Sequence, residues 1–309
     1  MTIAAWVRDR PHGERITVGC SGGLDSSVLL HALAAERAAQ RPDLDLRAHH
    51  VHHGLFPEAD TWLGHVGDFC ARLGVPFSAE RVSVDTGSGR GLEAAARQAR
   101  YASFARLATD CLVLAHHAED QAETVLLQLL RGGGPRALAG MPMQRQLGTI
   151  TLARPLLALP RAAIARYAEN HAIVAVDDPS NADTHLARAR LRVALWPALR
   201  DAFPDALEQI ASAARQHAEA ARLMDALAEH DLATCHSTGK LLLEPWQALA
   251  PERRRNVLRR WLIDQGAASP SWRGLAELAA QLEHVKTGLR VPLRPAEQEK
   301  KIELRAFRG

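Results

Sequence analysis

The stretch Ser21-Gly22-Gly23-Leu24-Asp25-Ser26-Ser27 decides the fold of this chain. It stands directly between a short apolar run, Ile16–Cys20, and an alanine-rich stretch with helical spacing, Leu24–Ala39. Glycines at such a bend let the backbone adopt conformations that strain other residues and approach a ligand closely. The N–H groups of the bend and of the helix N-terminus then form a site for a phosphate anion. The sequence therefore predicts a phosphate-binding loop between a strand and a helix.

The side chains of the loop allow two interpretations. Serine hydroxyls add donors for a phosphate, and Asp25 makes sense there if it orients the loop or helps to hold Mg²⁺. The alternative is a turn that only caps a helix, with Asp25 or Ser26 as the cap. The Gly-Lys-Ser/Thr ending of the Walker loop is absent. The candidate nucleotide-binding residues are Ser21, Gly22, Gly23, Leu24, Asp25 and Ser26.

Strand-like and helix-like segments alternate outward from the loop. Further strands are predicted at 44–51, 75–84 and 111–115, and helices at 57–73, 91–108 and 119–130. This alternation predicts an α/β fold with a parallel sheet and helices on both faces, which binds ligands at the carboxyl ends of its strands. Later helices are predicted at 204–233, 251–265 and 272–285. We expect a catalytic domain at 1–184 and a second, mainly helical domain at 185–309.

Composition excludes several classes of protein. The 309 residues are 47% hydrophobic and 24% charged, which is typical of a globular protein. No apolar run approaches the roughly 20 residues of a membrane helix, so we expect no membrane association. Charges occupy the N-terminal stretch where a signal peptide has its apolar centre, which predicts a cytoplasmic protein. The four cysteines are scattered without a CxxC pair, which argues against a disulfide framework, a zinc site or an iron–sulfur cluster.

Charge is distributed unevenly along the chain. Residues 1–184 carry 18 basic and 20 acidic side chains, whereas residues 185–309 carry 20 and 15. A basic second part is typical of an arm that binds a polyanion, although drift in surface composition gives the same pattern.

Further motifs accompany the loop. They are His50-Val51-His52-His53-Gly54-Leu55, a helical segment from Glu93 to Tyr101, His116-His117-Ala118-Glu119-Asp120-Gln121-Ala122-Glu123-Thr124, Arg131-Gly132-Gly133-Gly134, Arg154-Pro155-Leu156 and Asp177-Asp178-Pro179-Ser180-Asn181. With its SGGxDS string, the chain resembles the PP-loop ATP pyrophosphatases and, among these, the tRNA(Ile)-lysidine synthetases. The resemblance covers about residues 15 to 200 with specific motifs and continues more loosely through the helical part.

The resemblance implies a defined ligase reaction. ATP, with Mg²⁺, adenylates the oxygen on carbon 2 of the wobble cytidine of an isoleucine tRNA whose anticodon is CAU. The side-chain amine of free L-lysine then attacks that carbon and expels AMP, which leaves lysidine. A homodimer is an open alternative for the assembly of such an enzyme.

Asp120 and Glu123 are candidate catalytic residues, together with Asp25 and Arg97. Asp120 and Glu123 lie three apart and share a helical face, where they could coordinate Mg²⁺ or bind the lysine amine. The resemblance associates these positions with the active site and with lysine. Asp25 and Asp120 are the candidate Mg²⁺ ligands, because carboxylate oxygen matches the hard charge of this ion. The alternative is a solvated acidic first turn that the helix dipole favours.

Arginines supply the candidate anion contacts. Arg97 and Arg100 lie on one side of their helix, where a planar guanidinium would bind a phosphate or the lysine carboxylate. The alternative for Arg97 is a surface ion pair with Glu93, four residues earlier. Candidate tRNA contacts are Arg131 with its glycines, the run Arg188, Arg190 and Arg192, and the group Arg253, Arg254, Arg255, Arg259 and Arg260. A helix C-cap and solvated helix surfaces explain these features equally well.

The histidines at 49, 50, 52 and 53 suggest zinc, but no carboxylate or cysteine accompanies them at ligand spacing. We expect one histidine near the nucleotide and structural roles for the others. In a strand, His50 and His52 would share one face, and His49 and His53 the other.

The chain departs from the resembled family in two respects. Ala189 stands where an RNRLR-like stretch has asparagine, and longer relatives carry a further C-terminal domain that grips the acceptor end of tRNA. We expect either a short architecture or a lost domain. Two rival functions stay open, a tRNA cytidine thiolase that uses an iron–sulfur cluster and a non-catalytic protein that binds nucleotide or tRNA.

Overall fold

The computed structural model describes residues 2–84, 91–176, 187–268, 271–284, 290–293 and 302–305. The chain divides into two compact units, the first Met1–Leu127 with Gly140–Ser212 and the second Gln128–Ala139 with Ala213–Gly309. The expected boundary near residue 185 lies outside the described residues, as do Asp177–Asn181 and the glycines at 87 and 89. The expected domains 1–184 and 185–309 therefore stay a prediction.

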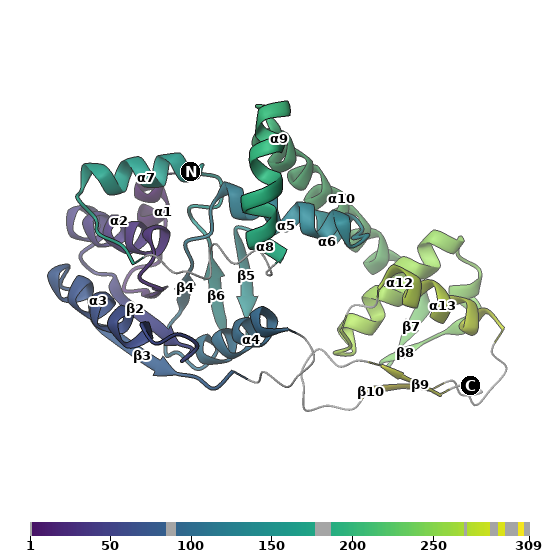
Figure 1. Ribbon diagram of the computed structural model, residues 1–309. Helices are drawn as coiled ribbons and strands as arrows, with labels where there is room; N and C mark the ends of the chain where they lie inside the picture. The colour runs from purple at the N-terminus through teal and green to yellow at the C-terminus, as the bar shows by residue number, and fades with distance from the viewer. Residues whose placement is uncertain are drawn as a thin grey trace. The chain divides into compact units, whose positions relative to one another are not determined.

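The first unit is built around a six-stranded sheet in the order β3-β2-β1-β4-β6-β5 (Figure 1). Its strands are β1 Arg15–Gly19, β2 Asp45–His52, β3 Phe77–Arg81, β4 Cys111–Val113, β5 Gln144–Leu147 and β6 Ile150–Ala153. All pairings are parallel except the antiparallel pair β5–β6. The predicted α/β class is confirmed. The sequence did not predict β5, because this edge strand is mostly polar and lacks an apolar run.

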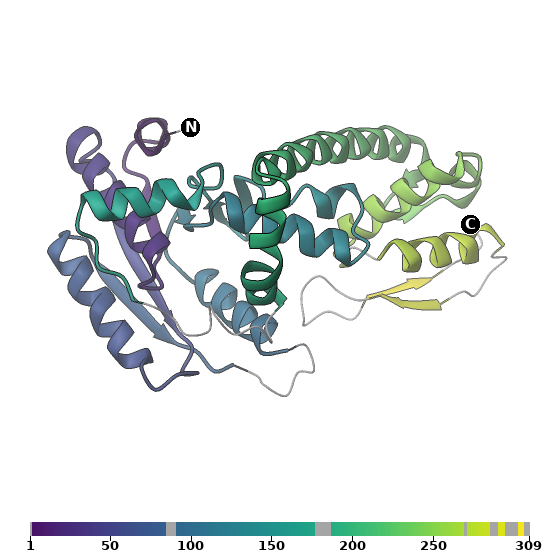
Figure 2. The ribbon, with the colours of Figure 1, turned by 45° about the horizontal axis from the view of Figure 1, so that its top comes forward.

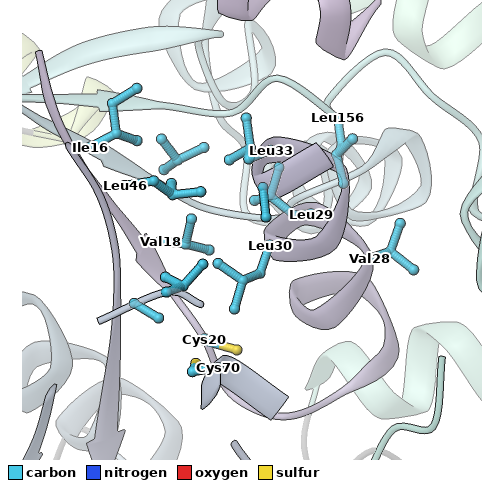
Figure 3. Packing of buried hydrophobic residues seen from close by; sticks show 14 of the residues in the cluster. Ile16, Val18, Cys20, Val28, Leu29, Leu30, Leu33, Leu46, Cys70 and Leu156 are labelled. Atoms are coloured by element: carbon cyan, nitrogen blue, oxygen red, sulfur yellow. The ribbon is translucent and has the colours of Figure 1, made fainter. Parts of the chain in front are cut away.

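Helices cover both faces of this sheet, as predicted. The helices are α1 Ile3–Arg8, α2 Leu24–Gln40, α3 Ala59–Arg72, α4 Leu92–Phe104, α5 Ala118–Leu130 and α7 Arg161–Asn170. On one face, Ile16 and Val18 of β1 pack with Leu29, Leu30 and Leu33 of α2 (Figure 3). On the other face, a second apolar cluster contains residues of β4 and β6 and Phe104 at the end of α4.

The strand β4 shows why the central strands have continuous apolar runs in their sequence. Cys111 and Val113 belong to the cluster on the α2 face, whereas Leu112 and Leu114 belong to the cluster on the α4 face. Successive side chains of a strand point to opposite faces, and both faces are buried here. Alternation of apolar and polar residues is therefore absent from this strand.

The order of the strands places a crevice at the ends of β1 and β4. After β1 the chain builds β2 and β3 on one side, and it then returns to build β4 on the other side of β1. Connections that leave two adjacent parallel strands in opposite directions open a crevice at their carboxyl ends. The predicted phosphate loop follows β1, and the His116-His117 segment follows β4. The fold thus brings the two motifs together.

Residues just beyond 186 complete the first unit. They form α8 Ala187–Arg190, a π-helical segment Leu191–Leu195 and α9 Trp196–Ala202. Leu191 and Trp196 form an apolar cluster with Ala122 of α5. Segment 187–199 therefore contributes side chains to the same unit as the phosphate loop.

The second unit is mainly helical, as predicted. It contains α6 Pro135–Leu138, most of α10 Ala206–Cys235, α11 Leu243–Gln247, α12 Pro251–Asp264 and α13 Trp272–Glu283, with the short strand pairs β7 His236–Ser237 with β8 Lys240–Leu241 and β9 Arg290–Leu293 with β10 Ile302–Arg305. Figure 2 shows α12 and α13 packed together, and Trp246, Leu258 and Leu278 lie in their shared core. No helix of the described residues is long and apolar enough to cross a membrane.

Candidate active site

The loop after β1 has the backbone of an anion-binding turn. Gly22 has a φ of +88°, and a Cβ there would lie 3.0 Å from Val66 Cγ2, so a side chain would be strained. The Gly22 carbonyl accepts a hydrogen bond from the Val176 N–H at 2.9 Å. Gly23 is the N-cap of α2, and no side chain caps this helix. The cap interpretation of Asp25 or Ser26 is therefore wrong, and the N-terminal N–H groups of α2 are available to a ligand.

The serine hydroxyls shape the loop from within. Ser26 Oγ donates to the Gly23 carbonyl at 3.0 Å and accepts from the Ser21 N–H at 3.2 Å. Ser27 Oγ donates to the Gly22 carbonyl at 3.4 Å. Both Ser26 and Ser27 are buried, whereas Ser21 is exposed. The hydroxyls of Ser26 and Ser27 therefore hold the loop in shape, and the exposed Ser21 is the serine that faces solvent.

Asp25 brings a carboxylate to this loop. Its Oδ2 lies 3.7 Å from His117 Nε2, and its Oδ1 lies 3.8 Å from Arg161 Nε. Oδ1 is buried and has no hydrogen-bond partner in the described part of the chain. Burial raises the pKa of Asp25 above its ordinary value, although the charges of His117 and Arg161 oppose this shift. A buried oxygen without a donor is available to a cation or to a donor on a ligand.

His117 links three carboxylates at the end of β4. Its Nε2 lies 3.4 Å from Asp120 Oδ2, and its Nδ1 lies 3.1 Å from Glu119 Oε2. Glu119 Oε2 also accepts from the Arg161 N–H at 2.9 Å, at the start of α7. Burial disfavours the charged imidazole, but the hydrogen bond to Glu119 and the charges of Asp120 and Asp25 outweigh it and raise the pKa of His117. His117 thus lies between Asp25 and Asp120, and its environment favours the protonated imidazole.

Asp120 and Glu123 share one face of α5, as their spacing predicts. Arg192 donates from Nε to Glu123 Oε1 at 2.8 Å and from Nη2 to Glu123 Oε2 at 3.0 Å. The same Nη2 lies 3.5 Å from Asp120 Oδ1. The Glu123 side chain is only 3% exposed, so the alternative of a solvated acidic turn is wrong for this residue.

Positive charge gathers around His116. Burial, followed by the charges of Arg154, Arg100, Arg97 and Arg188, lowers the pKa of His116 well below its ordinary value. The guanidinium of Arg97 lies 4.8 Å from the centre of the Tyr101 ring, and Arg154 is only 2% exposed. Within the described residues no carboxylate forms an ion pair with Arg97, Arg100 or Arg154. We call Arg97, Arg100, Arg154 and Arg188 the basic cluster.

Arg97 does not form the surface ion pair with Glu93 that was the alternative interpretation. Glu93 lies 3.7 Å from Arg188 Nε, and Arg97 donates instead to the Tyr101 hydroxyl at 3.3 Å. Among the described residues Arg188 is the one member of the basic cluster that pairs with a carboxylate. Arginines held together with so little negative charge favour an anionic ligand, because such a ligand supplies the missing counter-charge.

Histidines of β2 have local structural partners. His49 lies 2.8 Å from Ser78 Oγ and 3.1 Å from Ser103 Oγ, and His50 Nδ1 lies 2.9 Å from the Cys20 carbonyl oxygen. The rings of His50 and His52 are 6.5 Å apart, as expected for one face of a strand. The described residues contain no group of three or more histidine, cysteine, aspartate or glutamate side chains that could hold a metal ion.

The glycines after Arg131 cap α5. Gly132 has a φ of +71°, and its N–H donates to the Leu129 carbonyl at 3.0 Å. The Gly133 N–H donates to the Gln128 carbonyl at 2.8 Å. The C-cap interpretation is thereby confirmed, and a tRNA contact of Arg131 stays a prediction.

Sequence reasoning missed four members of this site. His117 and Glu119 lie in the same motif as Asp120, and their position beside that residue was the available signal. Arg161 and Arg192 carried no local signal, because α7 and the π-helical segment reach the site only through the tertiary fold. Arg192 was instead grouped with candidate tRNA contacts.

Comparison with known proteins defines the class. A family model described as a PP-loop domain matches residues 2–199, which include every residue of the site above. The chain therefore belongs to the PP-loop family. A second model, described as the TilS substrate binding domain, matches residues 241–309.

Particular relatives narrow this class. The chain is 49% identical over 267 residues to tRNA(Ile)-lysidine synthase of Alkalilimnicola ehrlichii, which covers 84% of the chain and 60% of the relative. The enzymes of the same name from Chromobacterium violaceum and Ralstonia nicotianae are 45% and 42% identical, over 90% and 95% of the chain and 64% and 63% of the relatives. The resemblance to tRNA(Ile)-lysidine synthetases is thereby confirmed. The chain spans about three fifths of the length of these relatives.

A solved structure supports the fold alone. The U34-tRNA thiolase NcsA from Methanococcus maripaludis, solved with its 4Fe-4S cluster, aligns with a TM-score of 0.58 and 17% identity over 69% of this chain and 76% of that chain. The four cysteines of the present chain are all free and buried.

Proposed function

We propose that this protein uses ATP to join free L-lysine to carbon 2 of the wobble cytidine of an isoleucine tRNA with a CAU anticodon. One observation carries the proposal. The PP-loop without a side-chain cap, the carboxylates around His117 and the basic cluster all belong to one unit, at the ends of β1 and β4. The names of the relatives support the choice of tRNA and lysine.

The reaction needs two displacements. The oxygen on carbon 2 of cytidine first attacks the α-phosphorus of ATP, and pyrophosphate leaves. The side-chain nitrogen of lysine then attacks carbon 2, loses a proton, and the carbon–oxygen bond breaks as AMP leaves with that oxygen. The first step requires a bound polyphosphate, and the second requires the lysine side-chain amine to be held close to the base and deprotonated before it attacks.

The site has positive groups for the phosphates and a carboxylate for the lysine amine. The N–H groups at the start of α2 would bind the polyphosphate. Asp120, whose ionic partners His117 and Arg192 lie at 3.4 and 3.5 Å, would receive the lysine amine, while Arg192 neutralises the buried Glu123. Arg97 and Arg100 would bind a phosphate or the lysine carboxylate.

Mg²⁺ fits this arrangement at Asp25. Asp25 Oδ1 is buried, accepts no hydrogen bond within the described residues and lies 3.8 Å from Arg161 Nε. It is a hard oxygen of the kind that Mg²⁺ prefers. Asp120 is the second candidate, although both of its oxygens already face protein donors. When bound, Mg²⁺ would neutralise charge on the polyphosphate.

The direct test supplies the protein with Mg²⁺, ATP, labelled lysine and the CAU-anticodon isoleucine tRNA transcript. We expect label in the tRNA, with pyrophosphate and AMP as products. A folded protein that releases pyrophosphate but transfers no lysine would contradict the second step. A protein that binds ATP and releases no pyrophosphate would be the non-catalytic alternative.

The thiolase alternative predicts a different preparation. A thiolase of this fold would contain iron and absorb visible light, whereas we expect a colourless, iron-free protein that is fully active.

We further propose that the protein acts in the cytoplasm, where tRNA, ATP and lysine are available.

A further inference from the structure

Trp272 is an exposed aromatic side chain of the second unit. It is 66% exposed at the first position of α13, where the Ser271 hydroxyl caps the helix. The chain has six tryptophans, and Trp6, Trp196 and Trp246 are buried. A single exposed apolar side chain is ordinary in a protein surface. A binding role of Trp272 therefore depends on the groups beside its indole ring.

Arg255 of α12 stacks on the Trp272 ring. The guanidinium carbon lies 5.0 Å from the centre of the ring. Arg255 Nε is buried and has no hydrogen-bond partner among the residues that the structure describes. Its acidic neighbour Glu252 lies 3.8 Å away and is itself 77% exposed. The charge of Arg255 is therefore weakly neutralised, and a phosphate could displace Glu252.

The other arginines of α12 are engaged within the second unit. Arg253 pairs with the buried Asp231, and Arg254 Nη1 lies 2.9 Å from Glu283 Oε1. Arg259 and Arg260 contact carboxylates of α10, and Arg260 also bonds Asp264. Of the five arginines of α12 that are candidate tRNA contacts, Arg255 is thus the one with the weakest ionic partner in the described structure.

A flat aromatic face beside a cation matches one ligand chemistry. An unpaired nucleobase stacks on an aromatic side chain, and the guanidinium adds a contact to the adjoining phosphate. The substrate-binding family model covers both residues, and residues 185–309 carry an excess of basic side chains. We propose that Trp272 and Arg255 form a stacking site for an unpaired nucleobase of the tRNA. This proposal rests on the proposed function, because it names how the same RNA substrate is held.

The test measures binding of the CAU-anticodon isoleucine tRNA transcript to the full chain by filter binding at one salt concentration. Trp272→Ala is expected to raise Kd by about 5- to 100-fold, since it removes the stack. Trp272→Phe keeps an aromatic face and is expected to stay within about threefold of the wild type. Arg273→Ala is the matched control, because Arg273 is the next residue, is exposed and pairs only with Glu277 in the described structure. Equal Kd values for Trp272→Ala and the wild type would overturn the proposal.

Activity and fluorescence provide independent measurements. At saturating tRNA, Trp272→Ala should keep the wild-type kcat for lysine transfer and show a raised KM for tRNA. The tRNA should quench tryptophan fluorescence of the wild type more than that of Trp272→Phe. A wild-type protein that binds tRNA but transfers no lysine would contradict the proposed function and leave the stacking site standing. A wild-type protein that transfers lysine, with an unchanged KM in Trp272→Ala, would contradict the stacking site alone.

Discussion

Two groups of arginines in this protein have opposite surroundings. In the basic cluster of the first unit, Arg97, Arg100 and Arg154 have no carboxylate partner among the described residues. Burial lowers the pKa of His116 most, and the charges of these arginines lower it further. Along α12 of the second unit, arginine after arginine meets an aspartate or a glutamate. Residue type alone does not distinguish the two groups.

The difference shows where charged side chains of this protein lack a partner of opposite charge and can therefore bind a ligand. Partly buried positive charges without partners cost free energy of folding, so they persist where a ligand supplies the counter-charge. The same reasoning applies to Asp25 Oδ1, which is buried and lacks a donor. Paired arginines, by contrast, contribute to the packing of the second unit. Substitutions in the two units should therefore differ in kind.

The largest effect is expected for Asp25→Asn. This change keeps the shape of the side chain but removes the negative charge that faces His117 and Arg161. Pyrophosphate release in the presence of tRNA should fall at least about 100-fold. Asp45→Asn is the control, because Asp45 forms an exposed pair with Arg47. Full activity of Asp25→Asn would show that the carboxylate has no role in adenylation.

Arg97→Ala should lower kcat/KM by about 100-fold, since it removes a cation from an anion-binding group. Arg106→Ala, which breaks an exposed pair with Glu80 just after the same helix, should stay within about twofold of the wild type. Steady-state assays of both variants measure the contrast. Similar losses in the two variants would contradict a special role of the basic cluster.

Arg259→Ala should act on stability. Arg259 is only 7% exposed, and its Nη2 donates to Asn256 Oδ1 at 3.1 Å and lies 3.5 Å from Asp225 Oδ1. Losing these contacts should lower the free energy of unfolding by about 2 kcal/mol, as urea denaturation would measure. The kcat for adenylation should not change. Unchanged stability would mean that α12 does not depend on this contact.

The smallest effect is expected for Arg260→Gln. Arg260 already bonds Asp264 and Glu229, so little of its charge is free for RNA. The Kd for tRNA should change less than about twofold, and the salt dependence of binding should keep its slope. A phosphate contact would instead lower that slope by about one unit per arginine. Such a decrease would show that α12 binds RNA despite its ion pairs.

Much of the fold could be predicted because its signals are local. Apolar runs predicted β1, β2 and β4 within about two residues, and helical spacing predicted α2, α5 and α12. The polar edge strand β5 and the π-helical segment carried no comparable signal. Within the site, the loop and the spacing of Asp120 and Glu123 were available from the sequence. The links made by His117, Arg161 and Arg192 were not.

The amino-acid sequence by itself determined the succession of the main strands and helices along the chain, the glycine bend after β1 and the carboxylates on α5. Each of these features depends on neighbours within a few residues. The tertiary structure alone decided which charges are neutralised. Arg192 meets Glu123 across 69 residues of chain, and Arg259 meets Asp225 on another helix. Burial and ion pairing depend on contacts between distant segments, so no local sequence pattern predicts which charges are buried or paired.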